Sequence, residues 1–343
     1  MTCKDALPIA TMRALETALA RALGADRVSI GESRRLSGGA IQENWMLDAR
    51  VWHDEAQSKT RWVLRRDAAA SVDTSRSRMD EAALLSTVVA VGVQAPAPLL
   101  ADAGALLGFP FFVMDMLPGT AAAHRLTRDA TLVPDRALLM RDLGANLARI
   151  HSLRPPSDGL GFLGATPAQP LQQRVLQLQQ QLDELGEARP ALEYGLRWAL
   201  RHAPDPSPVV LTHGDYRTGN LMVHEGRLSG ALDWEFAGWG DAREDIGWFA
   251  ARCWRFARPD LHGGGLGALE DFLDAYAQAG GEAFTLADIQ FWEVLAHLRW
   301  AVIALQQAHR HWSGRQRSLE LALTGRMVAE LELGALRATK EMR

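Results

Sequence analysis

The segment His213-Gly214-Asp215-Tyr216-Arg217-Thr218-Gly219-Asn220 is followed by Asp233-Trp234-Glu235, with Asn220 and Asp233 thirteen positions apart. Between them, two short apolar runs flank Glu225-Gly226, a pattern typical of a β-hairpin. Because a hairpin returns the chain to its starting edge, the side chains of Asn220 and Asp233 are expected to lie side by side. The sequence therefore predicts two oxygen-bearing side chains near one point, with Asp215 on the loop before them.

An aspartate, an asparagine and a second aspartate at this spacing fit a phosphoryl-transfer site. We expect Asp215 to orient and deprotonate the attacking hydroxyl of a substrate. Asn220 and Asp233 are expected to supply hard oxygen ligands to Mg²⁺, with nucleotide phosphates and water completing its shell. Arg217 is placed to neutralise charge on the transferred phosphoryl group. We interpret His213 as shaping the loop, with a direct role as base as the alternative.

The composition is that of a soluble globular protein. The chain has 343 residues, 48% hydrophobic and 23% charged, and a formal net charge of -4, which argues against nucleic-acid binding through a basic face. The cysteines, Cys3 and Cys253, form no metal-binding or disulfide pattern. Neither a signal peptide nor an apolar run of membrane-spanning length is recognised. We therefore expect a cytoplasmic enzyme or binding protein with no nucleic-acid or membrane partner.

The order of predicted elements suggests two lobes. Residues 11–23 have helical periodicity, 27–68 contain β-prone runs typical of an antiparallel meander, and a second helix is expected around 77–90. Phe109–Leu117 is strand-like and ends at Pro118-Gly119, a turn signal. From there the chain is mostly helical, with helices expected over 136–152, 170–185 and 289–305. We predict an α+β fold with a nucleotide-binding lobe at 1–117 and a helical lobe at 118–343, the latter holding the loop 213–220, the metal-binding segment 233–235 and the acceptor site.

The pattern His-Gly-Asp-x-x-x-x-Asn followed by Asp-Trp-Glu resembles the aminoglycoside phosphotransferase and choline kinase-like family, which shares the protein-kinase fold. The similarity extends from about residue 33 to about 310. The subgroup that looks most similar has Leu-Ser-Gly-Gly and Leu-Arg motifs, and includes kinase-like domains fused or adjacent to acyl-CoA dehydrogenases. This resemblance implies a two-lobed fold with the nucleotide bound between the lobes, and a substrate pair of ATP (or GTP) with Mg²⁺.

The resemblance also implies nucleotide-binding residues in the N-terminal lobe. Leu36-Ser37-Gly38-Gly39 is similar to the loop that covers the phosphates, so Ser37, Gly38 and Gly39 are expected to bind nucleotide. Arg65 stands where the family carries its phosphate-binding basic residue, with Glu81 as its partner. Asp115 and Met116 lie in a segment similar to the hinge that holds the adenine. A lysine is usual at the position of Arg65; Arg66 is the competing choice, but in a strand its side chain would face the other way.

The acceptor is less well defined by the sequence. Six arginines between 235 and 311 weaken the case for a polycationic antibiotic and favour an anionic or neutral hydroxylated molecule, such as a hydroxyacyl thioester (hydroxyacyl-CoA) or a sugar-like alcohol. Glu293, His297 and Arg299 lie in an apolar predicted helix, where buried charges need partners. We interpret them as an internal ion pair or exposed edge, with a place in the acceptor site as the alternative. Asp241 and Asp245 are interpreted as acceptors of backbone N–H bonds that hold the catalytic loop.

Two functions remain after this reading. The intact trio of Asp215, Asn220 and Asp233 favours a small-molecule O-phosphotransferase. The arginine at position 65 and the short glycine loop motivate a nucleotide-binding pseudokinase that acts as a regulatory or partner-binding module. A protein kinase is disfavoured because His-Gly-Asp replaces His-Arg-Asp, and because no Asp-Phe-Gly to Ala-Pro-Glu segment is present.

Overall fold

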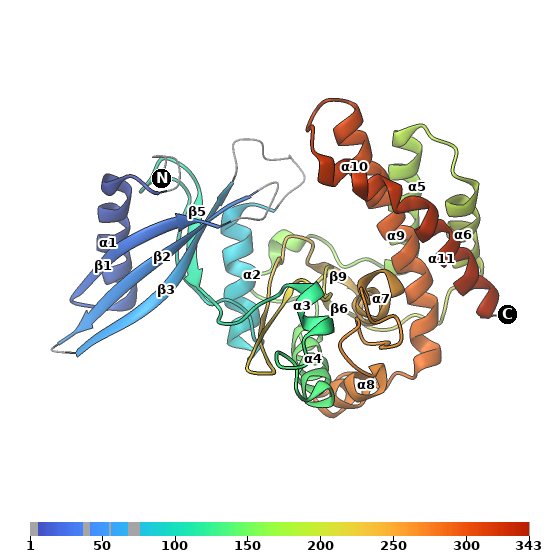
Figure 1. Cartoon of the computed structure of the whole chain (residues 1–343), viewed down its shortest axis with the longest axis horizontal. Helices are drawn as coiled ribbons and strands as arrows, with labels where there is room; N and C mark the ends of the chain where they lie inside the picture. Colours follow the sequence, from blue (N-terminus) through green and yellow to red (C-terminus); the bar gives the residue numbers. More distant parts are fainter. Residues whose placement is uncertain (1–5, 37–41, 55, 68–75, 343) are drawn as a thin grey trace. The chain divides into compact units, whose positions relative to one another are not determined.

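The computed structural model describes residues 6–36, 42–54, 56–67 and 76–342. Its internal contacts divide the chain into two compact units, which we call the N-terminal unit and the C-terminal unit. The N-terminal unit comprises Met1–Pro118, Asp158–Phe162 and Gly230–Glu235. The C-terminal unit comprises Gly119–Ser157, Leu163–Ser229 and Phe236–Arg343. Figure 1 traces the elements of each unit along the chain.

The described part of the N-terminal unit contains a five-stranded antiparallel sheet with strand order β1-β2-β3-β5-β4. Its strands are β1 (Arg27–Arg35), β2 (Gln42–His53), β3 (Ala56–Asp67), β4 (Pro98–Asp102) and β5 (Phe111–Asp115). The predicted meander is confirmed, since β1, β2 and β3 pair in chain order. The apolar run at 109–117 forms a strand that is shorter at both ends than the run itself, with Pro110 just before it.

Helix α1 (Ile9–Leu23) covers one face of this sheet (Figure 1). Its buried Leu15 and Leu19 share one apolar cluster with Trp62 and Leu64 of β3. Because side chains alternate across a strand, Val63 and Arg65 point to the opposite face. Helix α2 (Arg78–Ala90) supplies the buried Glu81 that meets Arg65 there. The alternation of β3 therefore decides which of two adjacent arginines is buried.

The C-terminal unit is mostly helical. Its helices are α3 (Ala123–Arg128), α4 (Arg136–His151), α5 (Pro170–Leu185), α6 (Pro190–Arg201), α7 (Ala242–Ala250), α8 (Leu269–Gln278), α9 (Leu286–Trp312), α10 (Leu319–Arg326) and α11 (Val328–Glu341). Two short 3₁₀ helices cover Gly161–Leu163 and Arg252–Trp254. Helices α5, α6, α9 and α11 lie beside one another (Figure 1), and their buried side chains form one apolar cluster. None of the helices in the described ranges is long and apolar enough to cross a membrane.

Two short antiparallel pairs frame the loop 213–220. Strand β6 (Val209–Thr212) pairs with β9 (Gly238–Asp241), and β7 (Leu221–His224) pairs with β8 (Arg227–Ala231). The hairpin predicted between Asn220 and Asp233 is therefore confirmed. The α+β class is confirmed as well, because an antiparallel sheet in one unit accompanies a helical second unit.

The predicted helix at 289–305 is longer than expected. Helix α9 begins at Leu286 because Thr285 and Asp288 form a capping box, in which each side chain accepts a hydrogen bond from the other residue's backbone. It continues to Trp312, where Ser313 caps it. The apolar stretch alone marked only the buried middle of the helix and missed its polar ends.

The division of the chain differs from the expected one at two short segments. Residues 158–162 and 230–235 lie beyond position 117, yet they belong to the N-terminal unit. For the second segment, the Ala231 N–H donates to the Gln94 carbonyl oxygen at 2.9 Å. Residues 233–235, which the sequence places in the helical lobe, therefore belong to the N-terminal unit, because a backbone contact with so distant a residue has no local sequence signal.

Candidate active site

In the N-terminal unit, Arg65 and Glu81 form a buried ion pair. The distance from Arg65 Nε to Glu81 Oε1 is 3.2 Å, and the two side chains are 6% and 1% exposed. Arg66 faces the other side of the sheet, where it contacts Glu43 at 2.6 Å and stacks over Phe109. The expectation that Arg65 rather than Arg66 meets Glu81 is confirmed. A guanidinium removed from water needs such a partner.

Glu81 has a second cationic partner that the sequence analysis did not identify. Arg78, fully buried one turn earlier on α2, contacts Glu81 Oε2 and reaches Asp67 Oδ1 at 3.0 Å. Charges of alternating sign therefore run from Asp67 through Arg78 and Glu81 to Arg65. The i, i+3 spacing of Arg78 and Glu81 on one helix was a usable signal.

The chain of charges ends at Asp233. Its Oδ1 lies 3.4 Å from Arg65 Nη2, and its side chain is 49% exposed. Asp233 has a backbone φ of 59°, a left-handed conformation that aspartate tolerates better than most residues. The next residue, Trp234, is buried and donates its indole N–H to the Ala231 carbonyl at 3.0 Å. A buried indole thus anchors a turn that presents a half-exposed carboxylate.

The remaining nucleotide-binding candidates are placed only in part. Ser37, Gly38 and Gly39 lie outside the described residues. Asp115 ends β5, and its N–H donates to the Ala97 carbonyl at 3.0 Å. Met116 donates its N–H to the Arg61 carbonyl at 3.1 Å. Half-burial raises the pKa of the Asp115 carboxyl.

In the C-terminal unit, the Asp245 side chain holds the loop 213–220 through its backbone. Its carboxylate accepts the backbone N–H groups of His213 at 2.6 Å and Gly214 at 2.8 Å. Burial opposes its charge, but the hydrogen bond to His151 and the nearby histidines hold the pKa of Asp245 below its usual value. The interpretation of Asp245 as a brace is confirmed. Asp241 instead caps α7 and pairs with Arg243, so for Asp241 the expected partner was wrong.

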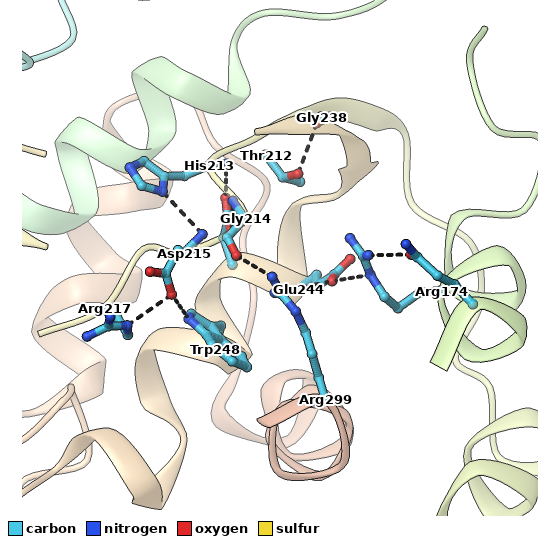
Figure 2. A network of polar contacts seen from close by, with 12 residues as sticks. Arg174, Thr212, His213, Gly214, Asp215, Arg217, Gly238, Glu244, Trp248 and Arg299 are labelled. Atoms are coloured by element: carbon cyan, nitrogen blue, oxygen red, sulfur yellow. Dashed lines mark hydrogen bonds and ion pairs between the residues drawn. The ribbon is translucent and has the colours of Figure 1, made fainter. Parts of the chain in front are cut away.

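Three donors surround the carboxylate of Asp215. Its Oδ1 accepts from Arg217 Nε at 3.0 Å and from the indole Nε1 of Trp248 at 2.8 Å. Its Oδ2 accepts from the amide nitrogen of Asn220, which also donates to the Asp215 carbonyl at 3.0 Å. The Asp215 N–H donates to His213 Nδ1 at 3.2 Å, so His213 shapes the loop as interpreted. The rotamer of Asp215 is thus fixed from several sides (Figure 2).

The orientation of Asn220 bears on the predicted metal. Because its amide nitrogen is used by Asp215, its carbonyl oxygen is the atom left for a cation. Asp233 offers a half-exposed carboxylate. One amide oxygen and one carboxylate are hard ligands in the small number that Mg²⁺ takes from a protein when phosphates and water supply the rest. Each of these two groups is therefore of a ligand type that fits Mg²⁺.

A second layer of contacts fixes the groups around Asp215 (Figure 2). The buried Arg299 donates to the Gly214 carbonyl at 2.7 Å, and its guanidinium stacks over Trp248 at 4.3 Å. It also lies 3.7 Å from Glu244, which pairs with Arg174 on α5 at 2.7 Å. The ion-pair interpretation of Arg299 is thus confirmed. The contact of Trp248 with Asp215 has no local sequence signal, because the two residues are 33 positions apart.

Arg217 and the neighbouring tryptophans complete this layer. The Arg217 guanidinium lies 4.6 Å from the centre of the Trp254 ring, a cation–π distance. Trp254 in turn contacts Trp248 at 5.1 Å and Trp300 at 4.9 Å between ring centroids.

The Glu293 carboxylate on α9 pairs with Arg255 at 2.8 Å and His262 at 2.5 Å. Glu293 and Arg299 of α9 therefore both have partners among the described residues, and Arg299 also contacts the loop 213–220 through Gly214.

Comparisons with known proteins agree with this geometry. The model of the phosphotransferase enzyme family matches residues 33–297. Acyl-CoA dehydrogenase family member 11 of Rattus norvegicus is 26% identical over 287 residues, which cover 79% of this chain and 36% of that protein. The chain thus spans about a third of the length of the curated relatives of this name.

Solved structures share the fold. A Ralstonia eutropha protein described as an aminoglycoside phosphotransferase matches with a TM-score of 0.74 at 18% identity, covering 96% of this chain and 98% of that one. An aminoglycoside phosphotransferase solved with AMP-PNP and hygromycin B matches with a TM-score of 0.59 at 13% identity, over 95% and 98% of the two chains. The predicted kinase-like fold is therefore confirmed. With its family model matched over most of its length and its Asp-Asn-Asp pattern intact, this chain belongs to the phosphotransferase enzyme family.

Proposed function

We propose that the protein transfers the γ-phosphate of ATP, in the presence of Mg²⁺, to a hydroxyl group of a small molecule. The observation that carries this proposal is the environment of Asp215, where three donors fix a carboxylate in one rotamer. A binding module does not need a prebuilt base, which is why the pseudokinase alternative is disfavoured. Two relatives by fold, solved with AMP-PNP and with ADP, support a nucleotide as the phosphate donor.

In this proposal the N-terminal unit binds the nucleotide. Arg65, braced by Glu81, neutralises phosphate charge with a guanidinium fork, which matches phosphate oxygens geometrically. Asp115 and Met116 contact the base, and Ser37, Gly38 and Gly39 cover the phosphates. Asp233 and Asn220 hold Mg²⁺. The metal, when bound, neutralises charge on the β- and γ-phosphates.

Asp215 receives the proton of the acceptor hydroxyl in this proposal. Oδ1 already accepts two hydrogen bonds, whereas Oδ2 accepts only that of Asn220 among the contacts of the described residues. The hydroxyl is therefore assigned to Oδ2. Arg217, held between Asp215 and the face of Trp254, turns toward the phosphoryl group as its charge develops.

Mass-spectrometric screening tests this function. Alcohols, amino alcohols, sugars, aminoglycosides and hydroxyacyl thioesters are incubated with ATP, Mg²⁺ and the protein, and products are sought that gain one phosphate. The same screen with Asp215→Ala is the control, and we expect it to yield no product. Nucleotide binding without transfer to any acceptor of the panel would favour the pseudokinase instead, and full turnover by Asp215→Ala would exclude the assigned base.

A further inference from the structure

A pocket in the C-terminal unit lies where α5, β9 and the start of α7 meet, and we call it the α5–β9 pocket. It encloses about 210 Å³. Its polar lining comes from Gln173, Arg174 and Gln177 of α5, Trp239 of β9 and Glu244 of α7. We propose that this pocket binds the non-reacting end of the phosphate acceptor, and that this end carries one negative charge. The inference deepens the proposed function and rests on it.

The charge of the pocket favours an anion. Glu244 is the single carboxylate in the lining, and it is matched by two arginines, Arg174 at 2.7 Å and Arg299 at 3.7 Å. Because Glu244 is shared between Arg174 and the buried Arg299 behind the lining, it does not neutralise Arg174 alone. Arg299 is fully enclosed, so the cation that a ligand can reach is Arg174, whose side chain is 26% exposed. A polycationic acceptor would find no carboxylate in the lining that is not already paired with an arginine.

The hydrogen-bonding groups of the lining point to the same class of ligand. Arg174 uses Nε for Glu244 and Nη1 for the Gln177 side-chain oxygen at 2.8 Å. Its Nη2 donates to no group of the described residues. Because the oxygen of Gln177 is occupied, its amide nitrogen is left as a donor. These donors suit a carboxylate or phosphate oxygen next to hydroxyl groups, and the ring of Trp239 offers an apolar wall.

The pocket is tied directly to the catalytic loop. Gly238 lies in its lining, and the Gly238 carbonyl accepts the Thr212 hydroxyl at 2.9 Å, immediately before His213 (Figure 2). Arg299 joins Glu244 to the carbonyl of Gly214, the residue before Asp215. A volume of about 210 Å³ is below the usual range for a whole drug-sized ligand. The pocket therefore holds one end of the acceptor and leaves its hydroxyl for Asp215.

The test uses linear six-carbon polyols that differ in charge: gluconate, gluconamide and glucamine. Binding to the full chain without nucleotide is measured by calorimetry, and phosphate transfer is measured separately by mass spectrometry. We expect gluconate to bind at least about tenfold more tightly than the other two, the effect of one charge-assisted hydrogen bond. Arg174→Gln should remove this preference. Gly238→Val should weaken gluconate binding as well, because a Cβ at Gly238 meets no atom within 4 Å and fills open space.

Arg197→Gln is the matched control. Arg197 lies on the neighbouring helix α6 and pairs with Glu193 at the exposed surface, so its loss removes the same charge without touching the pocket. The proposal is overturned if gluconate binds no better than gluconamide, or if Arg174→Gln and Arg197→Gln behave alike. Transfer to acceptors with no dependence on Arg174 would overturn the pocket and leave the proposed function intact. An Arg174-dependent preference for gluconate in a protein that phosphorylates no acceptor of the screening panel would overturn both, because the inference rests on the proposed function.

Discussion

The ionic chain around Arg65 and the hydrogen-bonded loop around Asp215 show two ways of holding a charged side chain. Arg65 is shared between Glu81, which is buried, and Asp233, which is half-exposed and 3.4 Å away. Asp215 instead accepts short bonds from three side chains that are themselves braced. The first arrangement keeps one loose partner that a ligand can replace. The second fixes its carboxylate before any ligand arrives, which is what chemistry at that atom requires.

The largest expected effect is the loss of phosphate transfer when Asp215 is replaced. Asp215→Ala should lower phosphate transfer by about 10²–10⁴-fold, the usual contribution of a general base, while nucleotide affinity stays within about twofold.

Asp233→Ala should weaken nucleotide binding by roughly tenfold or more, and only when Mg²⁺ is present, because it removes a metal ligand. Titrations with and without Mg²⁺ measure this difference.

Asp67→Ala is the control for the metal effect. Asp67 is another partly exposed carboxylate of the same ionic chain, paired with Arg78. Its loss should leave the Mg²⁺ dependence of nucleotide binding unchanged. If Asp67→Ala and Asp233→Ala reduce that dependence equally, Asp233 has no special role with the metal.

A second comparison tests whether the hydrogen bond from Trp248 is needed to hold the Asp215 carboxylate in place. Trp248→Phe removes the indole N–H that Oδ1 accepts and keeps a similar ring. We expect kcat to fall about ten- to a hundredfold with KM for ATP unchanged, the range for one hydrogen bond to a charged group. Trp300→Phe is the matched control, because the Trp300 indole N–H has no partner among the described residues and lies in the same aromatic cluster. Equal kinetics for the two variants would show that Trp248 is only core.

A third variant tests the ionic chain around Arg65. Arg65→Lys keeps the charge but replaces a guanidinium fork with a single ammonium group, which cannot reach Glu81 and Asp233 together. We expect the KM for ATP to rise by roughly tenfold, with a smaller change in kcat. Steady-state kinetics at saturating acceptor measure both. A larger fall in kcat than in nucleotide affinity would place Arg65 in the chemical step instead.

The smallest effect concerns stability and pH. Burial lowers the pKa of His297, which is neutral in the fold and bonded to the Glu293 carbonyl at 2.7 Å. Below the ordinary histidine value of 6.5, the unfolded chain binds a proton that the folded chain does not. The free energy of unfolding should therefore decrease as the pH falls below 6.5. Denaturant titrations of the parent and of His297→Gln should converge at low pH, and a parent that gains stability there would contradict this sign.

The sequence predicts elements that depend on local patterns better than contacts that depend on distant segments. The hairpin, the meander and the helices near 77–90 and 170–185 follow local periodicity, and the structure has them. The family resemblance pointed to Arg65, and strand alternation argued that Arg66 faces the other way. Trp248, Arg174 and Gln94 gave no such signal, since each meets its partner through the packing of distant segments. Asp241 differs from these, because its partner Arg243 lies only two residues away on the helix that Asp241 caps, a local pattern that the sequence did contain.

By itself the sequence determined the kind of chemistry, because the Asp-Asn-Asp spacing and the strand that carries Arg65 are local properties of the chain. The tertiary structure decided which groups hold these residues. Arg299 reaches Gly214 across 85 positions, and Trp248 reaches Asp215 across 33. The physical reason is that a hydrogen bond or an ion pair depends on distances of about 3 Å, and packing alone sets such distances between segments far apart in the chain.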